Sequence, residues 1–216
     1  MSGIPTTLEH RVLHPEGTGE AKHPTIIMLH GRGADEEDLL SLAEEYDPRL
    51  LVLSVRAPYP FSYGSGFTWY DVGTIGTPDP AMFRHSYGLL SGFVDDALRS
   101  YPVDPARLFL LGFSMGTVMA FALSLTRPEL FRGVVAQSGY VPEGTHLSFR
   151  WQALGDLAYF VAHGTEDPVI PVAFARRTRQ LFEQSNARVD YREYPMGHQI
   201  SQESIRDSAS FLNGLI

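Results

Sequence analysis

Cysteine is absent from this chain of 216 residues, and its absence excludes several classes of protein. The chain cannot be a disulfide scaffold, hold a zinc ribbon or an iron–sulfur cluster, or use a thiol as its nucleophile. Long apolar runs are missing too, since runs such as 108–111 and 133–136 are far shorter than the ~20 residues that span a bilayer. Residues 1–24 are polar and lack the apolar stretch of a secretion signal. We therefore expect a cytoplasmic protein without a stable membrane association.

Positive charge is also scarce: 17 Lys and Arg oppose 25 Asp and Glu, which gives a net charge of −8, and Lys22 is the only lysine. This balance disfavours nucleic acid as a partner on bulk electrostatics. Charged residues make up 19% of the chain and hydrophobic residues 44%, so the chain is able to bury a core. We expect one domain over 1–216, with 1–24 as an edge strand or loop. Whether the chain forms a homo-oligomer is not readable from the sequence.

Short apolar runs alternate with longer segments of helical spacing along the chain. This alternation predicts an α/β fold with a mostly parallel central sheet and helices on both faces. Strands are expected at 25–30, 50–55, 107–112, 133–137 and 157–162, with an edge-like strand at 188–194. Helices are expected at 35–45, 82–101, 115–125, 171–184 and 200–215.

The long segment 56–81 breaks this rhythm, with four glycines, four prolines and six aromatic residues. Segments of this length inside a compact domain usually carry function or are disordered, and the aromatics argue against disorder. Ligands of open α/β sheets bind beyond the carboxyl ends of the strands. We therefore expect Phe61, Phe67 and Trp69 to form a pocket wall, although a satellite core beneath the segment would use the same residues.

The sequence Gly112-Phe-Ser-Met-Gly116 lies between an apolar run and a helical segment without glycine or proline. A glycine two residues to either side of a serine, at a turn from strand to helix, is typical of a nucleophile elbow. The turn is tight, so residues without a Cβ let the strand and the helix approach closely. We therefore predict that Ser114 is a nucleophile, with an ordinary glycine-rich turn as the alternative interpretation.

A serine hydroxyl needs a base to accept its proton, and eight histidines compete for that role. His198 is favoured because it stands on a loop between the edge strand and the last helix, and His163 is the alternative. The base in turn needs a carboxylate to orient it. Asp167 is favoured because it follows the carboxyl end of the strand at 157–162, and Glu166 is its competitor.

Two main-chain amides are candidates for stabilising the oxyanion that forms when a serine attacks a carbonyl. One is the amide after the nucleophile, at Met115, and the other is expected in the loop after an early strand. That loop is His30-Gly-Arg-Gly-Ala-Asp35, whose glycines let the backbone bend towards a substrate, and Arg32 is the candidate. The same residues also suit a plain glycine turn in which Asp35 caps a helix.

Five ordered blocks make the chain resemble the phospholipase/carboxylesterase family of α/β-hydrolases, which includes bacterial carboxylesterases and acyl-protein thioesterases. The blocks are Leu29-His-Gly-Arg-Gly-Ala-Asp35, Trp69-Tyr-Asp71, Gly112-Phe-Ser-Met-Gly116, Gly164-Thr-Glu-Asp-Pro-Val-Ile-Pro171 and Pro195-Met-Gly-His198. The resemblance implies an α/β-hydrolase fold with a minimal cap. It also implies a catalytic triad of Ser114, Asp167 and His198, and an oxyanion hole formed by the amides of Arg32 and Met115.

The chain also departs from this family at three positions. Where the family often has leucine, glutamine and a further glycine, this chain has Arg32, Met115 and Thr117. An oxyanion hole made of main-chain amides tolerates these changes. The side chains border the site, however, so they bear on substrate preference.

These features predict a serine hydrolase that cleaves carboxylic esters of short to medium acyl chains through an acyl-enzyme, without a metal or cofactor. A small-molecule ester is the expected partner, and Val169, two residues after Asp167, is expected to line the pocket. A thioesterase or lysophospholipase with the same triad is the alternative. A non-catalytic protein of the same fold that binds a small ligand is the alternative from another class.

Overall fold

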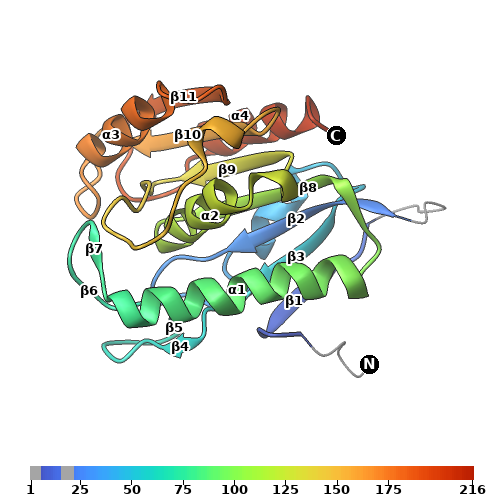
Figure 1. Ribbon diagram of the computed structural model, residues 1–216, viewed down its shortest axis with the longest axis horizontal. Coiled ribbons are helices and arrows are strands. Elements are labelled where there is room, and N and C mark those ends of the chain that lie inside the picture. The colour runs from blue at the N-terminus through green and yellow to red at the C-terminus, as the bar shows by residue number, and fades with distance from the viewer. Residues whose placement is uncertain (1–5, 16–21) are drawn as a thin grey trace.

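The computed structural model describes residues 6–15 and 22–216. A seven-stranded sheet forms its centre, in the spatial order β1 (His10–Leu13), β3 (Leu51–Val55), β2 (His23–Leu29), β8 (Val103–Phe113), β9 (Gly133–Gln137), β10 (Ala158–Gly164) and β11 (Arg188–Tyr194) (Figure 1). β1 pairs antiparallel with β3, and the other pairings in this sheet are parallel. The prediction of a mostly parallel sheet is confirmed.

Helices cover both faces of the sheet, also as predicted (Figure 1). One face carries α1 (Pro80–Ser100), α2 (Met115–Thr126) and α3 (Val172–Phe182), and the other carries α4 (Gln202–Asn213) and the 3-10 helix η1 (Leu40–Glu45). Two more short 3-10 helices, η2 (Pro128–Leu130) and η3 (Trp151–Ala153), lie in connections. Among the described residues, none of the helices combines the length and apolar character needed to cross a bilayer.

The strands divide their side chains between two cores. In β2, Ile27 and Leu29 contribute to the core under α1 and α2, whereas Ile26 and Met28 contribute to the core under α4. Successive residues of a strand point to opposite faces, so a strand that is covered on both faces reads as a continuous apolar run. This explains why the runs of the central strands were readable in the sequence.

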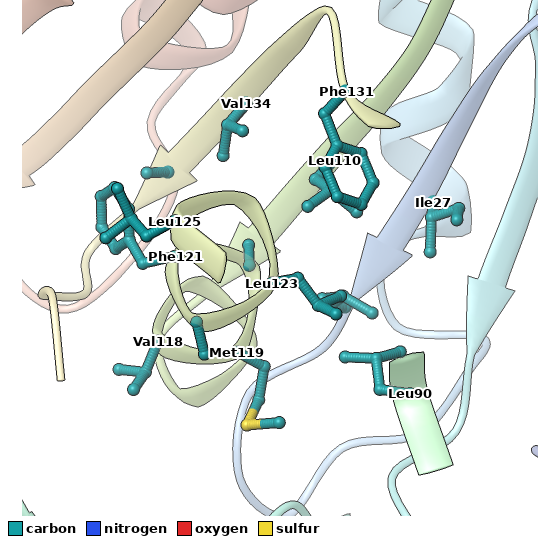
Figure 2. Packing of buried hydrophobic residues seen from close by; sticks show 14 of the residues in the cluster. Ile27, Leu90, Leu110, Val118, Met119, Phe121, Leu123, Leu125, Phe131 and Val134 are labelled. Carbon is teal, nitrogen blue, oxygen red and sulfur yellow. The ribbon is translucent and has the colours of Figure 1, made fainter. Parts of the chain in front are cut away.

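Helix α2 lies at the centre of the larger core. Every residue of α2 from Met115 to Leu125 is buried, which is typical of a helix that is apolar on all sides. Figure 2 shows its Val118 and Phe121 among side chains such as Leu110 of β8 and Val134 of β9. The helix that follows Ser114 is therefore closely packed on all sides, which restricts the movement of the serine at its N-terminus.

The predicted helix over 35–45 is wrong in its first half, where the chain forms turns and only Leu40–Glu45 is helical. The Asp35 carboxylate accepts a hydrogen bond from the amide of Glu37 at 2.9 Å. Glu36 is buried and accepts two hydrogen bonds of 2.6 Å from the guanidinium of Arg56. The main-chain hydrogen bonds of this stretch, from Asp38 to Asp35 and from Leu40 to Glu37, span three residues, as in turns, rather than the four of an α-helix.

The segment 56–81 is not without secondary structure. It contains two antiparallel hairpins, formed by β4 (Tyr59–Pro60) with β5 (Phe67–Thr68) and by β6 (Val72–Thr74) with β7 (Thr77–Pro78). An isolated bridge also pairs Ala34 with Phe67. The segment is thereby attached to the loop that follows β2, at the carboxyl edge of the sheet.

Candidate active site

Ser114 stands at the turn from β8 to α2, with a backbone φ of 54° in the left-handed region that non-glycine residues rarely adopt. The flanking glycines make this turn possible. A Cβ on Gly112 would lie 2.5 Å from the amide nitrogen of Thr117, and a Cβ on Gly116 would lie 1.9 Å from the carbonyl oxygen of Leu29. The turn thus has the sterics of a strained nucleophile elbow.

Three side chains from separate parts of the chain form one hydrogen-bonded row. The Ser114 hydroxyl donates to His198 Nε2 over 2.9 Å, and His198 Nδ1 donates to Asp167 Oδ2 over 2.7 Å. The Asp167 side chain is fully buried, and its Oδ1 accepts hydrogen bonds of 2.8 Å from the amides of Val169 and Ile170. Because these amides fix the carboxylate, the carboxylate fixes the tautomer and orientation of the imidazole.

The loops that carry Asp167 and His198 follow two adjacent parallel strands, β10 and β11. They pack closely because Gly164 lacks a side chain, and a Cβ there would lie 2.2 Å from the carbonyl oxygen of Met196. The ring of Phe113 lies against the His198 ring, with 5.0 Å between centroids. These contacts hold the imidazole within reach of Ser114.

The alternative residues for base and carboxylate, His163 and Glu166, are not members of this row. His163 is buried, its Nε2 donates to the carbonyl oxygen of Ile170 over 2.8 Å, and burial lowers its pKa, which favours the neutral ring. It approaches Asp167 at 3.4 Å rather than Ser114. Glu166 is exposed to solvent. The structure therefore brings together Ser114, His198 and Asp167, and leaves both competitors outside the row.

The residues proposed for the oxyanion hole, Arg32 and Met115, border the same hollow as Ser114. Met115 is the first residue of α2, so its amide has no acceptor within the helix. Within the described residues, the amide of Arg32 donates to no protein acceptor. Two free amides and a helix N-terminus beside the serine suit a developing negative charge.

His30 secures the loop that carries Arg32. It is buried, its Nδ1 donates to the carbonyl of Gly31 over 2.7 Å, and its Nε2 accepts from the amide of Ala57 at 3.0 Å. Burial lowers the pKa of His30, which favours this neutral form. His30 is therefore a structural residue that links the loop to the start of the segment 56–81.

The expectation that Phe61, Phe67 and Trp69 line the pocket is corrected by the structure. Trp69 has no exposed surface, and its indole Nε1 donates to the carbonyl of His30 over 3.0 Å. The carbonyl of Phe67 accepts from the amide of Gly33 at 2.8 Å, while its ring lies 4.6 Å from the guanidinium carbon of Arg56. Phe61 packs against Gly33 of the loop after β2 and against Gly64 of its own segment. These aromatics support the loop of the candidate oxyanion hole from outside the hollow.

The hollow beside Ser114 is small, with a cavity volume of about 30 Å³, and it opens to solvent. Besides Ser114 and the two candidate oxyanion residues, its lining is aliphatic and aromatic: Tyr70, Val72, Ile75, Val118, Tyr140, Val169 and Ile170. Val169 lies where the sequence predicted it. In the described part of the chain, no three His, Asp or Glu side chains are grouped as a metal site would require.

Tyr70 and Tyr140 are lining residues that sequence reasoning missed. Burial raises the pKa of both hydroxyls, so both are neutral and polar within an otherwise apolar wall. Signals for both were present in the sequence. Tyr70 is part of the block Trp69-Tyr-Asp71, and Tyr140 closely follows the predicted strand at 133–137, at the sheet edge where ligands bind.

Comparison with known proteins places the chain in a family. The model of the phospholipase/carboxylesterase family matches residues 13–216. Acyl-protein thioesterase 1 of Candida albicans is 24% identical over 92% of this chain and 94% of its own, and that of Cryptococcus neoformans is 27% identical over 97% and 98%. The crystal structure of the Bacillus cereus carboxylesterase superposes with a TM-score of 0.85, at 25% identity over 97% of this chain and 95% of that one. The protein therefore belongs to the phospholipase/carboxylesterase family and has the α/β-hydrolase fold.

Proposed function

We propose that this protein is a serine hydrolase that cleaves carboxylic esters of short to medium acyl chains through an acyl-enzyme. The observation that carries the proposal is the hydrogen-bonded row from Ser114 through His198 to Asp167 beside an apolar hollow. Nucleophile, base and orienting carboxylate have the geometry that acyl transfer requires. Membership of a family of hydrolases supports the same chemistry.

In the acylation half, Ser114 Oγ attacks the ester carbonyl carbon while its proton passes to His198 Nε2. The carbonyl oxygen becomes an oxyanion, which the amides of Arg32 and Met115 stabilise. The bond to the leaving alcohol then breaks, and the alcohol oxygen takes the proton from His198. The buried Asp167 stabilises the imidazolium between these two transfers.

In the deacylation half, water attacks the acyl-enzyme carbonyl and gives a proton to His198 Nε2. Collapse of the second oxyanion releases the carboxylic acid, and the same proton returns to Ser114 Oγ. The free enzyme is thereby regenerated. Every proton passes through one imidazole atom, Nε2, which explains why Nδ1 is committed to Asp167.

The size of the hollow supports the preference for short to medium acyl chains. Its cavity volume of about 30 Å³ is far below the several hundred Å³ of a typical ligand site, and the hollow opens to solvent, so it does not enclose a long chain. Esters of p-nitrophenol with graded acyl chains test this preference. We expect kcat/KM to peak among the short to medium chains, because the cavity is too small to enclose a long one. A peak at about sixteen carbons, the length of a membrane-lipid chain, would contradict the proposal.

Thioester hydrolysis is the second candidate, because the named relatives are acyl-protein thioesterases. The same triad attacks a thioester with a thiolate in place of the alkoxide as leaving group. Matched oxygen esters and thioesters of one acyl chain separate the two candidates by their kcat/KM ratio. A small-molecule ester as the partner and a cytoplasmic location remain predictions.

The direct test compares wild type with Ser114→Ala and Ser210→Ala, the latter an exposed serine on α4. We expect Ser114→Ala to lose about 10³-fold or more of kcat and Ser210→Ala to keep the wild-type rate. Near-UV circular dichroism checks that both variants fold. An inactive wild type that binds esters without turnover would favour the non-catalytic ligand-binding alternative.

A further inference from the structure

Arg32 places a positive charge at the mouth of the hollow beside Ser114. The residue lines that hollow and is exposed to solvent. Its guanidinium carbon lies 5.5 Å from the centre of the Phe61 ring, so the ring supports the side chain from one side by a cation–π contact. The contact with Phe61 therefore limits the movement of the Arg32 side chain, and Arg32 and Ser114 border the same hollow.

This charge has no carboxylate partner among the described residues, and no acidic residue lines the hollow. Most arginines of the chain differ in this respect. The ion-paired arginines include Arg11, Arg49, Arg56, Arg99, Arg107, Arg127, Arg150, Arg176, Arg177 and Arg192. The chain has eight more acidic than basic residues, yet Arg32, beside the proposed nucleophile, has no acidic partner within the ranges that the structure describes. Its guanidinium is therefore available to bind an anion from outside the protein.

Arg32 is proposed to act through both its main-chain amide and its guanidinium, and this limits where a bound anion would lie. The amide of Arg32 is a proposed donor to the carbonyl oxygen of the substrate, so its side chain starts next to the scissile bond. A group that the guanidinium contacts must then lie within a few bonds of that carbonyl. The rest of the wall is apolar apart from two neutral tyrosines, and accommodates the hydrocarbon part of the same substrate.

We propose that Arg32 selects esters that carry a carboxylate a few bonds from the scissile carbonyl, such as half-esters of dicarboxylic acids. This inference rests on the proposed ester hydrolysis and names its substrate class. The planar fork of arginine matches a carboxylate with two parallel hydrogen bonds. A phosphate usually recruits several cationic or amide donors, and Arg32 is the only cationic side chain in the lining of this hollow.

The test uses two matched pairs of substrates that differ only in charge. In the first pair the charge is on the acyl side: mono-4-nitrophenyl adipate against the corresponding adipamate, which has a neutral amide in place of the carboxylate. In the second pair it is on the alcohol side: 3-acetoxybenzoate against 3-acetoxybenzamide. Spontaneous hydrolysis is subtracted, and kcat/KM is measured for wild type, Arg32→Leu, Arg32→Lys and Arg188→Leu.

We expect wild type to prefer the carboxylate by about tenfold or more in at least one pair, mainly through a lower KM. Arg32→Leu should reduce this ratio to about one, and Arg32→Lys should keep part of it because the charge remains without the fork. High salt should lower the wild-type ratio. Arg188→Leu is the matched control, because Arg188 is exposed at the amino end of β11, at the opposite edge of the sheet, and should keep the wild-type ratio.

A wild-type ratio of one or below in both pairs would overturn this inference, as would an unchanged ratio in Arg32→Leu. If Arg32→Leu does not fold, the wild-type ratio and the Arg32→Lys variant still decide. Failure of the proposed function is distinct from these outcomes. It would appear as no hydrolysis of either member of a pair, or as hydrolysis that persists in Ser114→Ala.

Discussion

The turn at Ser114 and the segment 56–81 both shape the active site, but they do so by opposite means. The turn joins a buried strand to a buried helix, and its geometry depends on side chains that are missing at Gly112 and Gly116. The segment contains two short hairpins and acts through hydrogen bonds that its main chain and Trp69 make to the loop at 30–35. The proposed nucleophile, Ser114, is thus held by the core of the protein, and the candidate oxyanion loop is supported by other loops.

Gly116→Ala should give the largest effect, because it disrupts the tight turn that joins β8 to α2. The added Cβ would lie 1.9 Å from the carbonyl oxygen of Leu29, which is main chain of a central strand and has no room to move. We expect a loss of about 3 kcal/mol or more in the free energy of unfolding, as for severe overpacking. Activity should also fall, because α2 can no longer pack against β2 in the position that presents Ser114. Urea unfolding and ester kinetics measure both effects.

The matched control for this substitution is Gly88→Ala in α1. Gly88 is exposed, and a Cβ there would meet nothing within 4 Å. Alanine in place of glycine in an exposed helix stabilises by about 0.5–1 kcal/mol, so the control should be slightly more stable than wild type. If Gly116→Ala were as stable as Gly88→Ala, the turn at Ser114 would not depend on the absence of a side chain at position 116.

Trp69→Phe tests the support of the oxyanion loop and should have an intermediate effect. It removes the indole donor and leaves the buried carbonyl of His30 unpaired, which costs about 1–3 kcal/mol. Because the loop carries the Arg32 amide, kcat should fall about tenfold. Trp151→Phe is the control, since its indole packs edge-on against Phe182 in another part of the core. A full loss of activity at Trp151 and none at Trp69 would refute this role.

Acidification should have the smallest effect, and it should act through two buried histidines, His30 beside the candidate oxyanion loop and His163 in β10. Burial lowers the pKa of both His30 and His163, so folding favours their neutral rings. Their stabilising contribution is present above the unfolded pKa of about 6.5 and is lost as the pH falls through the lower folded values. The free energy of unfolding should therefore be lower at pH 5.5 than at pH 8. The carboxylate of Glu193 has its pKa lowered to about 2 by Arg176, so it does not titrate in this window.

Urea unfolding at the two pH values, with an NMR titration of the histidine rings, checks this prediction. At His30 the proton would also displace the hydrogen bond that Nε2 accepts from Ala57. Amide exchange at Ala57 should therefore become faster at pH 5.5 by more than at sites in α2, after correction for intrinsic rates. A protein that gains stability on acidification, or a His30 pKa above its usual value, would show that the neutral ring is not favoured by the fold.

The sequence predicted the parts of the site whose cause is local. The Gly112-Phe-Ser-Met-Gly116 turn could be recognised because steric need and residue type coincide over five positions. The strands were readable because burial on both faces leaves continuous apolar runs. Asp167 and His198 were predicted from their positions after strands, and the structure brings both to Ser114.

The parts that could not be predicted depend on contacts between distant residues. Trp69 supports the candidate oxyanion loop through one hydrogen bond to His30, and the composition of its own segment carries no sign of that partner. The acidic stretch after Asp35 resembles an exposed helix start, and its sequence carries no sign that Glu36 is buried in an ion pair with Arg56. Sequence periodicity records which face of an element is buried and not which distant group it meets.

Covalent labelling shows most directly whether Ser114 is a nucleophile that His198 activates. A fluorophosphonate reacts with an activated serine, and intact-mass spectrometry with peptide mapping identifies the modified residue. We predict one adduct per chain, on Ser114, that is absent from Ser114→Ala and forms much more slowly in His198→Ala. An adduct on another residue, or undiminished labelling of Ser114→Ala, would contradict this prediction.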